Sequence, residues 1–109
     1  MTLSTHVLDA TTGRPAADVT VLLERRGPDG GWARSESGRT DDDGRLWLPS
    51  MVSPGVYRVT FGTGDYFARR GVPTFYPQVA VAFEVTSPTE HYHVPLLLSP
   101  FSYSTYRGS

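Results

Sequence analysis

The stretch HYHVPLLLSPFSYSTYRGS, residues 91–109, sets the structural pattern of the whole chain. It begins with two histidines on alternate positions, continues as an apolar run, and is broken by Ser99-Pro100 before a second, aromatic segment. Two such segments separated by turn residues are typical of paired β-strands, and we expect strands at residues 92–98 and 103–106. Chain ends are normally frayed and polar, so the aromatic and cationic side chains here predict a docked tail.

The same alternation recurs earlier in the chain. Residues 3–8, 19–24, 56–61 and 76–85 alternate apolar and polar side chains with the two-residue period of a half-buried strand. Shorter strands are expected at residues 32–35 and 45–48. Turn residues separate these segments, namely Thr11-Thr12-Gly13-Arg14-Pro15, Pro28-Asp29-Gly30-Gly31, Thr40-Asp41-Asp42-Asp43-Gly44, residues 49–55 and Ser87-Pro88-Thr89.

One segment departs from the strand period. Residues 65–70 predict a short helix, with Asp65 as its N-cap and Gly71 as its C-terminal stop. Regularly spaced short strands with a single helix favour an all-β fold, a two-sheet antiparallel β-sandwich with Greek-key-like connections. We expect one domain over residues 1–109.

Composition excludes several function classes. The formal net charge of -1 gives no electrostatic basis for binding nucleic acid or an anionic membrane. All ten cationic residues are arginine, so lysine chemistry is excluded, and the absence of cysteine excludes thiol catalysis and disulfides. No signal-like or membrane-spanning apolar segment is evident, so a cytoplasmic location is expected. A small sandwich with open sheet edges favours association into a dimer or a dimer of dimers.

Three histidines supply candidate acid–base groups, since a histidine pKa lies close to neutral pH. His91 and His93 share one face of a strand. That spacing fits a two-ligand metal corner, one working base beside an exposed neighbour, or two polar positions on a solvated face. His6 lies on the opposite face of its strand from Val7.

Other polar residues have both a functional and a structural interpretation. Arg45 follows a turn. Its planar guanidinium suits an anionic substrate or a developing oxyanion, and the alternative interpretation is a solvated surface charge. Arg107 positions the tail or pairs with a terminal carboxylate, and Tyr106 packs or contacts a ligand. Ser109 is a ligand contact or only a chain end. The run Asp41-Asp42-Asp43 lacks a complete calcium-loop pattern and is interpreted as a solvated turn.

Three ordered segments resemble the signature motifs of the 5-hydroxyisourate hydrolases, transthyretin-like enzymes of urate breakdown. Ser4-Thr5-His6-Val7-Leu8-Asp9 with Gly13-Arg14-Pro15-Ala16 is similar to the N-terminal motif, and Asp43-Gly44-Arg45 to the internal motif. Residues 93–109, closing on Tyr106-Arg107-Gly108-Ser109, are similar to the C-terminal motif. The resemblance covers the chain from end to end and implies a transthyretin-like sandwich.

The resemblance also implies the reaction, hydrolysis of 5-hydroxyisourate to 2-oxo-4-hydroxy-4-carboxy-5-ureidoimidazoline. It implies no metal or organic cofactor, and a homotetramer with sites in a channel between dimers. Carried over residue by residue, the resemblance makes His6, Arg45 and His93 the catalytic residues. It assigns substrate binding to His6, Arg45, Tyr106 and Ser109. Arg107 would anchor the tail. Opening a ring by water needs a base, an oxyanion partner and an acid, and which histidine is the base stays open.

Other classes stay open beside the hydrolase. A transthyretin-like carrier would hold a small ligand in the same channel without turnover, but would leave the histidines and the terminal motif without a purpose. An adhesive sandwich module would be expected to carry tandem copies or exposed tails. Zinc held by His91 and His93 would make hydrolysis metal-dependent, although no third ligand of matching spacing is evident.

Overall fold

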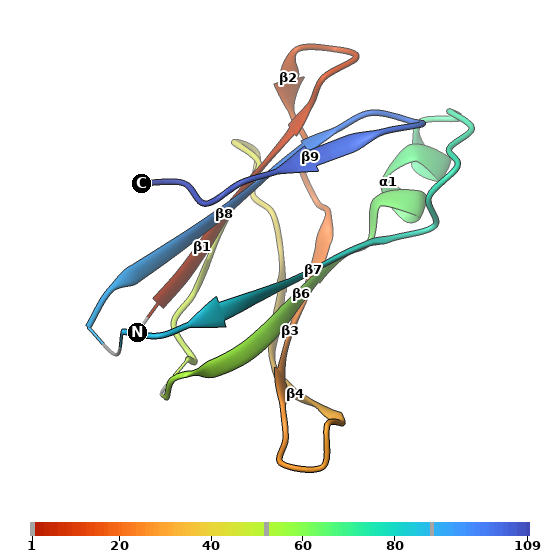
Figure 1. Ribbon diagram of the computed structural model, residues 1–109. Coiled ribbons are helices and arrows are strands. Elements are labelled where there is room, and N and C mark those ends of the chain that lie inside the picture. Colours follow the sequence, from red (N-terminus) through yellow and green to blue (C-terminus); the bar gives the residue numbers. More distant parts are fainter. Residues whose placement is uncertain (1, 52, 88) are drawn as a thin grey trace.

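Two β-sheets pack face to face in the computed structural model, which describes residues 2–51, 53–87 and 89–109 (Figure 1). The elements in chain order are β1 (Thr2–Asp9), β2 (Arg14–Pro15), β3 (Thr20–Arg26), β4 (Trp32–Arg39), β5 (Arg45–Leu48), β6 (Gly55–Phe61), α1 (Thr63–Arg69), β7 (Val79–Val85), β8 (His91–Leu98) and β9 (Tyr103–Thr105). The all-β sandwich of two sheets with one short helix that the sequence predicts is confirmed.

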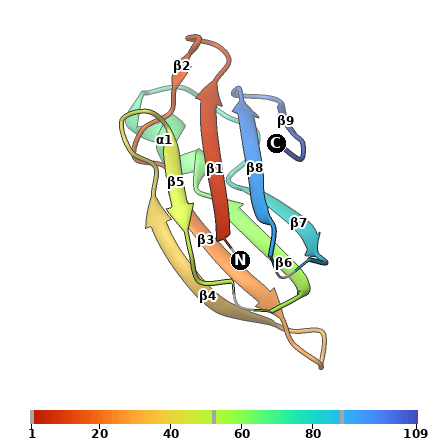
Figure 2. The ribbon, with the colours of Figure 1, turned by 90° about the vertical axis from the view of Figure 1, so that its left-hand side faces the viewer.

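The first sheet has the order β2-β1-β8-β9, with β5 also paired to β1, and the second has the order β4-β3-β6-β7. All neighbouring strands are antiparallel except β1 and β8, which run parallel. Figure 2 shows β5, β1 and β8 side by side in front of the second sheet. The predicted antiparallel sandwich is confirmed in that antiparallel pairs dominate both sheets, and the one parallel pair forms because β8 returns to the first sheet after β7.

Alternating apolar side chains from both sheets form the core. Each strand turns every second residue inward, so burial follows the period of two in β1, β3 and β6. The buried side chains on the two inner faces include Leu3, Val7, Val21, Leu23, Tyr57, Val59, Phe61, Leu96 and Leu98. The inward positions predicted in residues 3–8, 19–24 and 56–61 are confirmed, and the opposite face of β1 and β8 is left free to carry polar groups.

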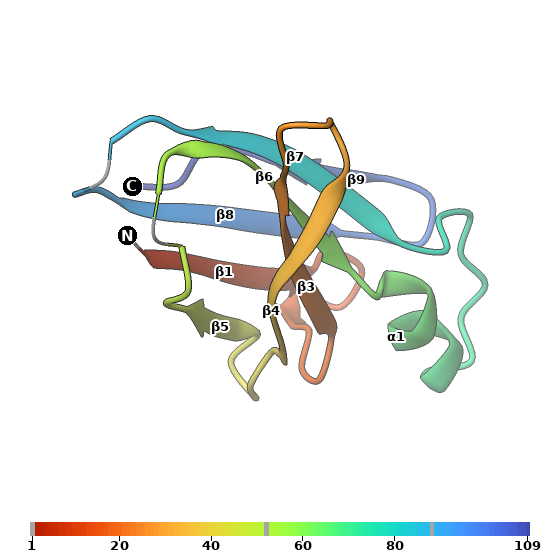
Figure 3. The same cartoon turned by 90° about the horizontal axis from the view of Figure 1, so that it is seen from below.

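Helix α1 links β6 to β7 and lies at the opposite end of the molecule from the two chain ends (Figure 3). It begins two residues earlier than predicted, and its N-cap is Gly62, which offers no side-chain hydrogen bond. The prediction of Asp65 as N-cap is wrong, because Asp65 lies in the first turn, where a carboxylate still favours the helix dipole. The predicted stop at Gly71 is confirmed by its φ of 68°, which glycine adopts without strain.

Two strand boundaries differ from the prediction by three residues or more, and the predicted turn at residues 11–15 includes the short strand β2, because Arg14 and Pro15 pair with β1. β4 extends to Arg39, because this edge strand pairs with β3 although its mostly exposed side chains show little apolar alternation. β7 starts at Val79 rather than at residue 76, because residues 74–76 are held by the turn after β8. There Phe75 N donates to Pro100 O at 2.9 Å, and the ring of Tyr76 packs edge-on against Tyr103 at 5.1 Å.

Two predicted turns include a residue that the structure does not describe, and the prediction that no segment spans a membrane can be compared with the helix. The predicted turn at residues 87–89 includes Pro88, which lies outside the described residues, as does Val52 in the predicted break at 49–55. None of the helical segments within the described ranges has the length and apolar character needed to cross a bilayer.

Candidate active site

The outer face of the first sheet brings together the three residues predicted to be catalytic. In β1 the inward positions are Leu3, Thr5, Val7 and Asp9, so Ser4 and His6 project outward. Antiparallel pairing places Arg45 of β5 directly opposite His6, and parallel pairing places His93 of β8 directly opposite Ser4. Because directly paired residues point to the same side of a sheet, His6, Arg45 and His93 lie on one surface within two residue steps along the strands.

A tight turn holds the ring of His6. His6 Nε2 lies 2.9 Å from the carbonyl oxygen of Asp43, and Val7 N donates to Gly44 O at 2.7 Å. Gly44 has a φ of 75°, and a Cβ there would come within 2.3 Å of Val7 O, so only glycine fits against β1. A carbonyl oxygen only accepts, so Nε2 carries the hydrogen and a neutral His6 presents Nδ1 as its basic nitrogen.

His93 is half-buried, and its Nδ1 lies 2.8 Å from Ser4 Oγ. Burial lowers the pKa of His93, and a hydrogen bond with the backbone of Ser4 opposes that shift only in part. The nearby positive charge of Arg45, together with His6 and His91, lowers this pKa further. His93 is therefore neutral at neutral pH, with Nδ1 engaged by Ser4 and Nε2 as the nitrogen left for a reactant.

Arg45 is exposed, and its guanidinium makes no ion pair with any residue in the described ranges. Its backbone is held firmly, since Arg45 N donates to Asp41 Oδ1 at 2.9 Å. A guanidinium fork on a fixed backbone beside two imidazoles suits an anionic or carbonyl-bearing substrate.

The C-terminal segment continues β9 along β8 as far as His93. Thr105 pairs with Leu96, and a further bridge joins Gly108 to His93, with Gly108 N donating to His93 O at 2.8 Å. A Cβ at Gly108 would come within 2.3 Å of His93 Cδ2, so this close approach requires glycine. By alternation between these pairs Tyr106 lies on the outer face, where it is 59% exposed, and Ser109 follows directly after the bridge.

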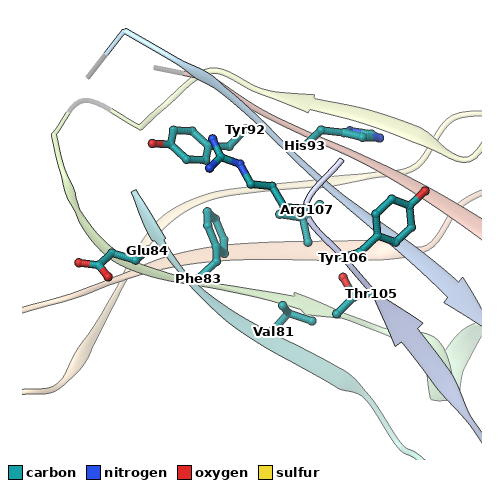
Figure 4. Close-up of a pocket in the computed structure, with 9 residues that line it drawn as sticks. Val81, Phe83, Glu84, Tyr92, His93, Thr105, Tyr106 and Arg107 are labelled. Carbon is teal, nitrogen blue, oxygen red and sulfur yellow. The ribbon is translucent and has the colours of Figure 1, made fainter. Parts of the chain in front are cut away.

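Arg107 points to the other side of the tail. Its Nη2 lies 3.0 Å from Glu90 Oε2, and its guanidinium lies over the ring of Tyr92 at 4.9 Å from the centroid. In Figure 4 the Arg107 side chain lies beside the Tyr92 ring, whereas the rings of His93 and Tyr106 point away from that pair. A mainly apolar cavity of about 280 Å³ lies here, lined by Val81, Phe83 and Thr105 among others. These contacts suit the predicted anchoring role of Arg107, which stays a prediction.

A second hollow of about 460 Å³ lies against the polar group on the outer face. Its walls include Ser4, Arg45, Trp47 and His93. It has room for a small heterocycle beside one neutral imidazole and one free guanidinium, which together provide a base and a stabiliser of negative charge.

The alternative metal site on His91 and His93 is crossed by a hydroxyl group that bonds both imidazole rings. Ser4 Oγ lies 2.8 Å from His91 Nε2 and 2.8 Å from His93 Nδ1, so the hydroxyl stands between the two rings. Within residues 2–51, 53–87 and 89–109, no group of three or more His, Cys, Asp or Glu side chains is placed to hold a metal ion.

Sequence reasoning missed three neighbours of the histidines. Alternation along residues 3–8 already places Ser4 on the same face as His6, yet the parallel pairing that brings Ser4 to His93 has no local signal. The contact of the Asp43 carbonyl oxygen with His6 could not be predicted either, because every residue has a backbone carbonyl and the sequence does not show which one is used. Trp47, two residues after Arg45, shares the outer face by the same alternation and was not singled out.

Comparison with known proteins agrees with this geometry. A family model described as the HIUase/Transthyretin family matches residues 3–108. The chain is 51% identical over 110 residues to the 5-hydroxyisourate hydrolase of Salmonella typhimurium, covering 98% of this chain and 80% of that protein. It is 46% identical over 111 residues to the 5-hydroxyisourate hydrolase of Mus musculus, covering 98% and 94%.

Solved structures show the same similarity in three dimensions. The 5-hydroxyisourate hydrolase of Klebsiella pneumoniae superposes with a TM-score of 0.88 at 37% identity, covering 100% of both chains. Sea bream transthyretin in complex with thyroxine superposes with a TM-score of 0.90 at 35% identity, covering 97% of this chain and 93% of that one. Fold similarity is thus nearly the same for a hydrolase and for a transthyretin that binds thyroxine, and the site residues have to separate the two functions.

Proposed function

The chain belongs to the HIUase/Transthyretin family, and we propose that it is the enzyme of that family, a 5-hydroxyisourate hydrolase acting in urate degradation. Its product would be 2-oxo-4-hydroxy-4-carboxy-5-ureidoimidazoline. The observation that carries the proposal is the cluster of His6, Arg45 and His93 on one outer face, where Arg45 and His93 line a hollow of about 460 Å³. A carrier has no use for a neutral imidazole beside a guanidinium that forms no ion pair within the part of the chain that the structure describes.

The proposed mechanism starts from the state of His93. Because its pKa is lowered, the ring is neutral at neutral pH, and Nε2 takes a proton from a water molecule as the water oxygen adds to a ring carbonyl carbon. The carbonyl oxygen then carries negative charge, which Arg45 stabilises. When the carbon–nitrogen bond breaks, Nε2 of His93 returns the proton to the leaving nitrogen, so atoms and charge balance.

The other site residues hold the substrate. His6, fixed through Nε2 by the Asp43 carbonyl, presents Nδ1 as an acceptor for a substrate N–H or as a second proton acceptor. Tyr106 and Ser109 complete the site from the tail, whose backbone pairs with His93.

We propose a homotetramer, a dimer of dimers built from one such domain per chain over residues 1–109. The support is apolar surface on the site-bearing sheet and its flanking turn, where Trp47 is 58% exposed, Phe101 68% and Leu97 38%. Large exposed apolar groups of this kind are typical of an interface. Sedimentation equilibrium tests the assembly, and a monomer at micromolar concentration would contradict it.

The decisive experiment is the decay of 5-hydroxyisourate absorbance, with substrate freshly made from urate by urate oxidase. Faster decay with the protein that survives a chelator supports metal-independent hydrolysis. Acceleration abolished by the chelator would instead support the zinc alternative. Decay at the spontaneous rate, with saturable binding of an aromatic ligand, would contradict the hydrolase and favour the carrier.

A further inference from the structure

Four side chains form one hydrogen-bonded row beside the proposed catalytic residues. Thr2 Oγ1 lies 2.5 Å from His91 Nδ1, His91 Nε2 lies 2.8 Å from Ser4 Oγ, and Ser4 Oγ lies 2.8 Å from His93 Nδ1. The parallel register produces this row, because it pairs Thr2 with His91 and Ser4 with His93. The hydroxyls of Thr2 and Ser4 therefore each meet an imidazole of β8, and of the four ring nitrogens of His91 and His93 only Nε2 of His93 has no partner in the row.

The hydroxyl hydrogen of Ser4 determines which group donates in each hydrogen bond of the row. Ser4 Oγ has no third hydrogen-bond partner among the described residues, so its hydrogen lies on one of the two imidazole bonds. With neutral rings, if Ser4 donates to His91, then His93 Nδ1 donates to Ser4 and His93 Nε2 keeps its lone pair. If Ser4 donates to His93 instead, Nε2 carries the hydrogen and cannot act as a base.

His91 is held in place by an aromatic neighbour. Its ring stacks on Trp47 with centroids 4.7 Å apart and planes 13° from parallel. With both nitrogens hydrogen-bonded and one face covered, this exposed histidine has far fewer orientations than a free surface side chain.

We propose that His91 is a positioning residue that acts on His93 through Ser4. The inference rests on the proposed function and deepens it. By accepting the hydrogen of Ser4, His91 holds His93 in the tautomer that bears hydrogen on Nδ1, so that Nε2 is the basic nitrogen facing the substrate.

The row also transfers a proton from His93 through Ser4 to His91 when His93 acts as a base. As Nε2 of His93 takes a proton from water, the Nδ1 hydrogen passes to Ser4 Oγ and the hydroxyl hydrogen of Ser4 passes to His91 Nε2. Ser4 loses one hydrogen and gains one, His93 stays neutral, and His91 becomes the imidazolium. The positive charge thereby moves away from Arg45 toward solvent, which lowers the cost of forming it. The reverse transfers return the proton for the leaving nitrogen.

Four variants test this link. His91→Phe keeps a ring over Trp47 but removes both nitrogens, and His91→Gln restores a polar group at the position of Nε2. Ser4→Ala removes the connecting hydroxyl. The double variant Ser4→Ala with His91→Phe completes a double-mutant cycle that measures the coupling between the two residues. Circular dichroism and the thermal midpoint establish that each variant folds.

We expect His91→Phe to lower kcat by about tenfold or more with little change in KM, since one hydrogen bond to a group that becomes charged is lost. His91→Gln should recover part of that loss. In the Ser4→Ala background, His91→Phe should have no further effect, because the link is already broken. An equal effect of His91→Phe in both backgrounds, or no effect in the wild type, would overturn the proposal.

A readout without substrate separates this inference from the proposed function. Nitrogen-15 NMR of the His93 ring distinguishes a protonated from an unprotonated Nδ1, and we expect hydrogen on Nδ1 in the wild type and a shift toward Nε2 in His91→Phe. An unchanged tautomer would contradict the link even in an active enzyme. A wild-type protein that does not accelerate substrate decay would instead remove the proposed function, whatever the tautomer.

Discussion

Gly108 lies so close to His93 that any side chain at residue 108 would collide with the imidazole. A Cβ there would come within 2.3 Å of His93 Cδ2, while Gly108 N donates to His93 O at 2.8 Å. The last residues of the chain thus pack directly on the proposed base. The tail cannot move without releasing one side of His93, so the position of a proposed catalytic group depends on a segment that usually frays.

Gly108→Ala should reduce kcat/KM by about 10- to 100-fold, because the added methyl group displaces either the ring of His93 or the tail. The thermal midpoint should barely change, since the segment is near the surface. Gly31→Ala is the matched control, because its new Cβ would contact only the flexible side chain of Asp29 at 3.3 Å, far from the site. Equal kinetics for the two variants would show that His93 tolerates the displacement.

Arg45→Ala should lower kcat/KM by about 10²- to 10³-fold, the usual effect of removing one group that stabilises an oxyanion. Arg45→Lys should recover only part of this, because lysine keeps the charge but loses the planar fork. Arg34→Ala serves as control, since Arg34 is exposed on β4 of the other sheet and its guanidinium bonds the hydroxyl of Ser37. Turnover unaffected by Arg45→Ala would remove this residue from the mechanism.

Arg107→Ala should loosen the tail without unfolding the protein. The ion pair with Glu90 is exposed, so the free energy of unfolding should change by less than about 1 kcal/mol. Hydrogen exchange of the Gly108 amide should accelerate, and kcat/KM should fall severalfold. Glu90→Gln should have a smaller effect, because the contact of Arg107 with the Tyr92 ring remains. Unchanged exchange at Gly108 in Arg107→Ala would contradict the anchoring role.

The activity profile should reflect the lowered pKa of His93. Burial lowers this pKa below its ordinary value of 6.5, and a base is active only when deprotonated. We therefore expect kcat/KM to stay level from pH 8 down to about pH 6.5 and to fall only in more acidic solution. An NMR titration of the His93 ring should give the same midpoint. An acid limb that begins above pH 7 would assign the base to another group.

Asp9 should contribute stability that is lost in acid. This buried carboxylate accepts hydrogen bonds from Thr11 and from Tyr66 of α1, at 2.9 Å for the tyrosine. Burial raises the pKa of Asp9, but these hydrogen bonds outweigh burial and leave the pKa below its ordinary range. A lowered pKa in the folded state means that the stabilisation is complete above the unfolded pKa of about 3.9 and is lost as the pH falls through the folded value.

Two substitutions check the role of Asp9. At pH 7, Asp9→Asn should cost about 1–3 kcal/mol and Tyr66→Phe about 1 kcal/mol in urea denaturation. The difference between the wild type and Asp9→Asn should shrink as the pH falls below about 4. A difference that does not depend on pH would mean that packing, and not the charge of Asp9, holds α1 against β1.

The residues that sequence reasoning placed correctly are those whose environment is set by local periodicity. Alternation alone put His6 opposite Val7 and put His91 and His93 on one face, because successive side chains of any strand point to opposite sides. The turn before Arg45 was equally local, since Gly44 and the preceding aspartates encode it. The resemblance of three short motifs then selected His6, Arg45 and His93 from among many polar positions.

The errors came from contacts between distant parts of the chain. The strand predicted from residue 76 starts only at Val79, because Phe75 N donates to Pro100 O in the turn after β8 and the Tyr76 ring packs against Tyr103 of β9. The predicted N-cap at Asp65 failed because Gly62 fits tightly against Thr20, where a Cβ would lie 2.0 Å from the hydroxyl. Neither contact leaves a pattern in the neighbouring sequence.

The sequence by itself determined the sandwich, the face on which each strand buries its side chains and the chemical groups available for hydrolysis, because these follow from a period of two and from residue type. Only the tertiary structure decided the parallel pairing of β1 with β8, which puts Ser4 between two imidazoles separated from it by 87 and 89 residues. The physical reason is that hydrogen-bond register between distant strands is set by the packing of the whole core, which no local segment encodes.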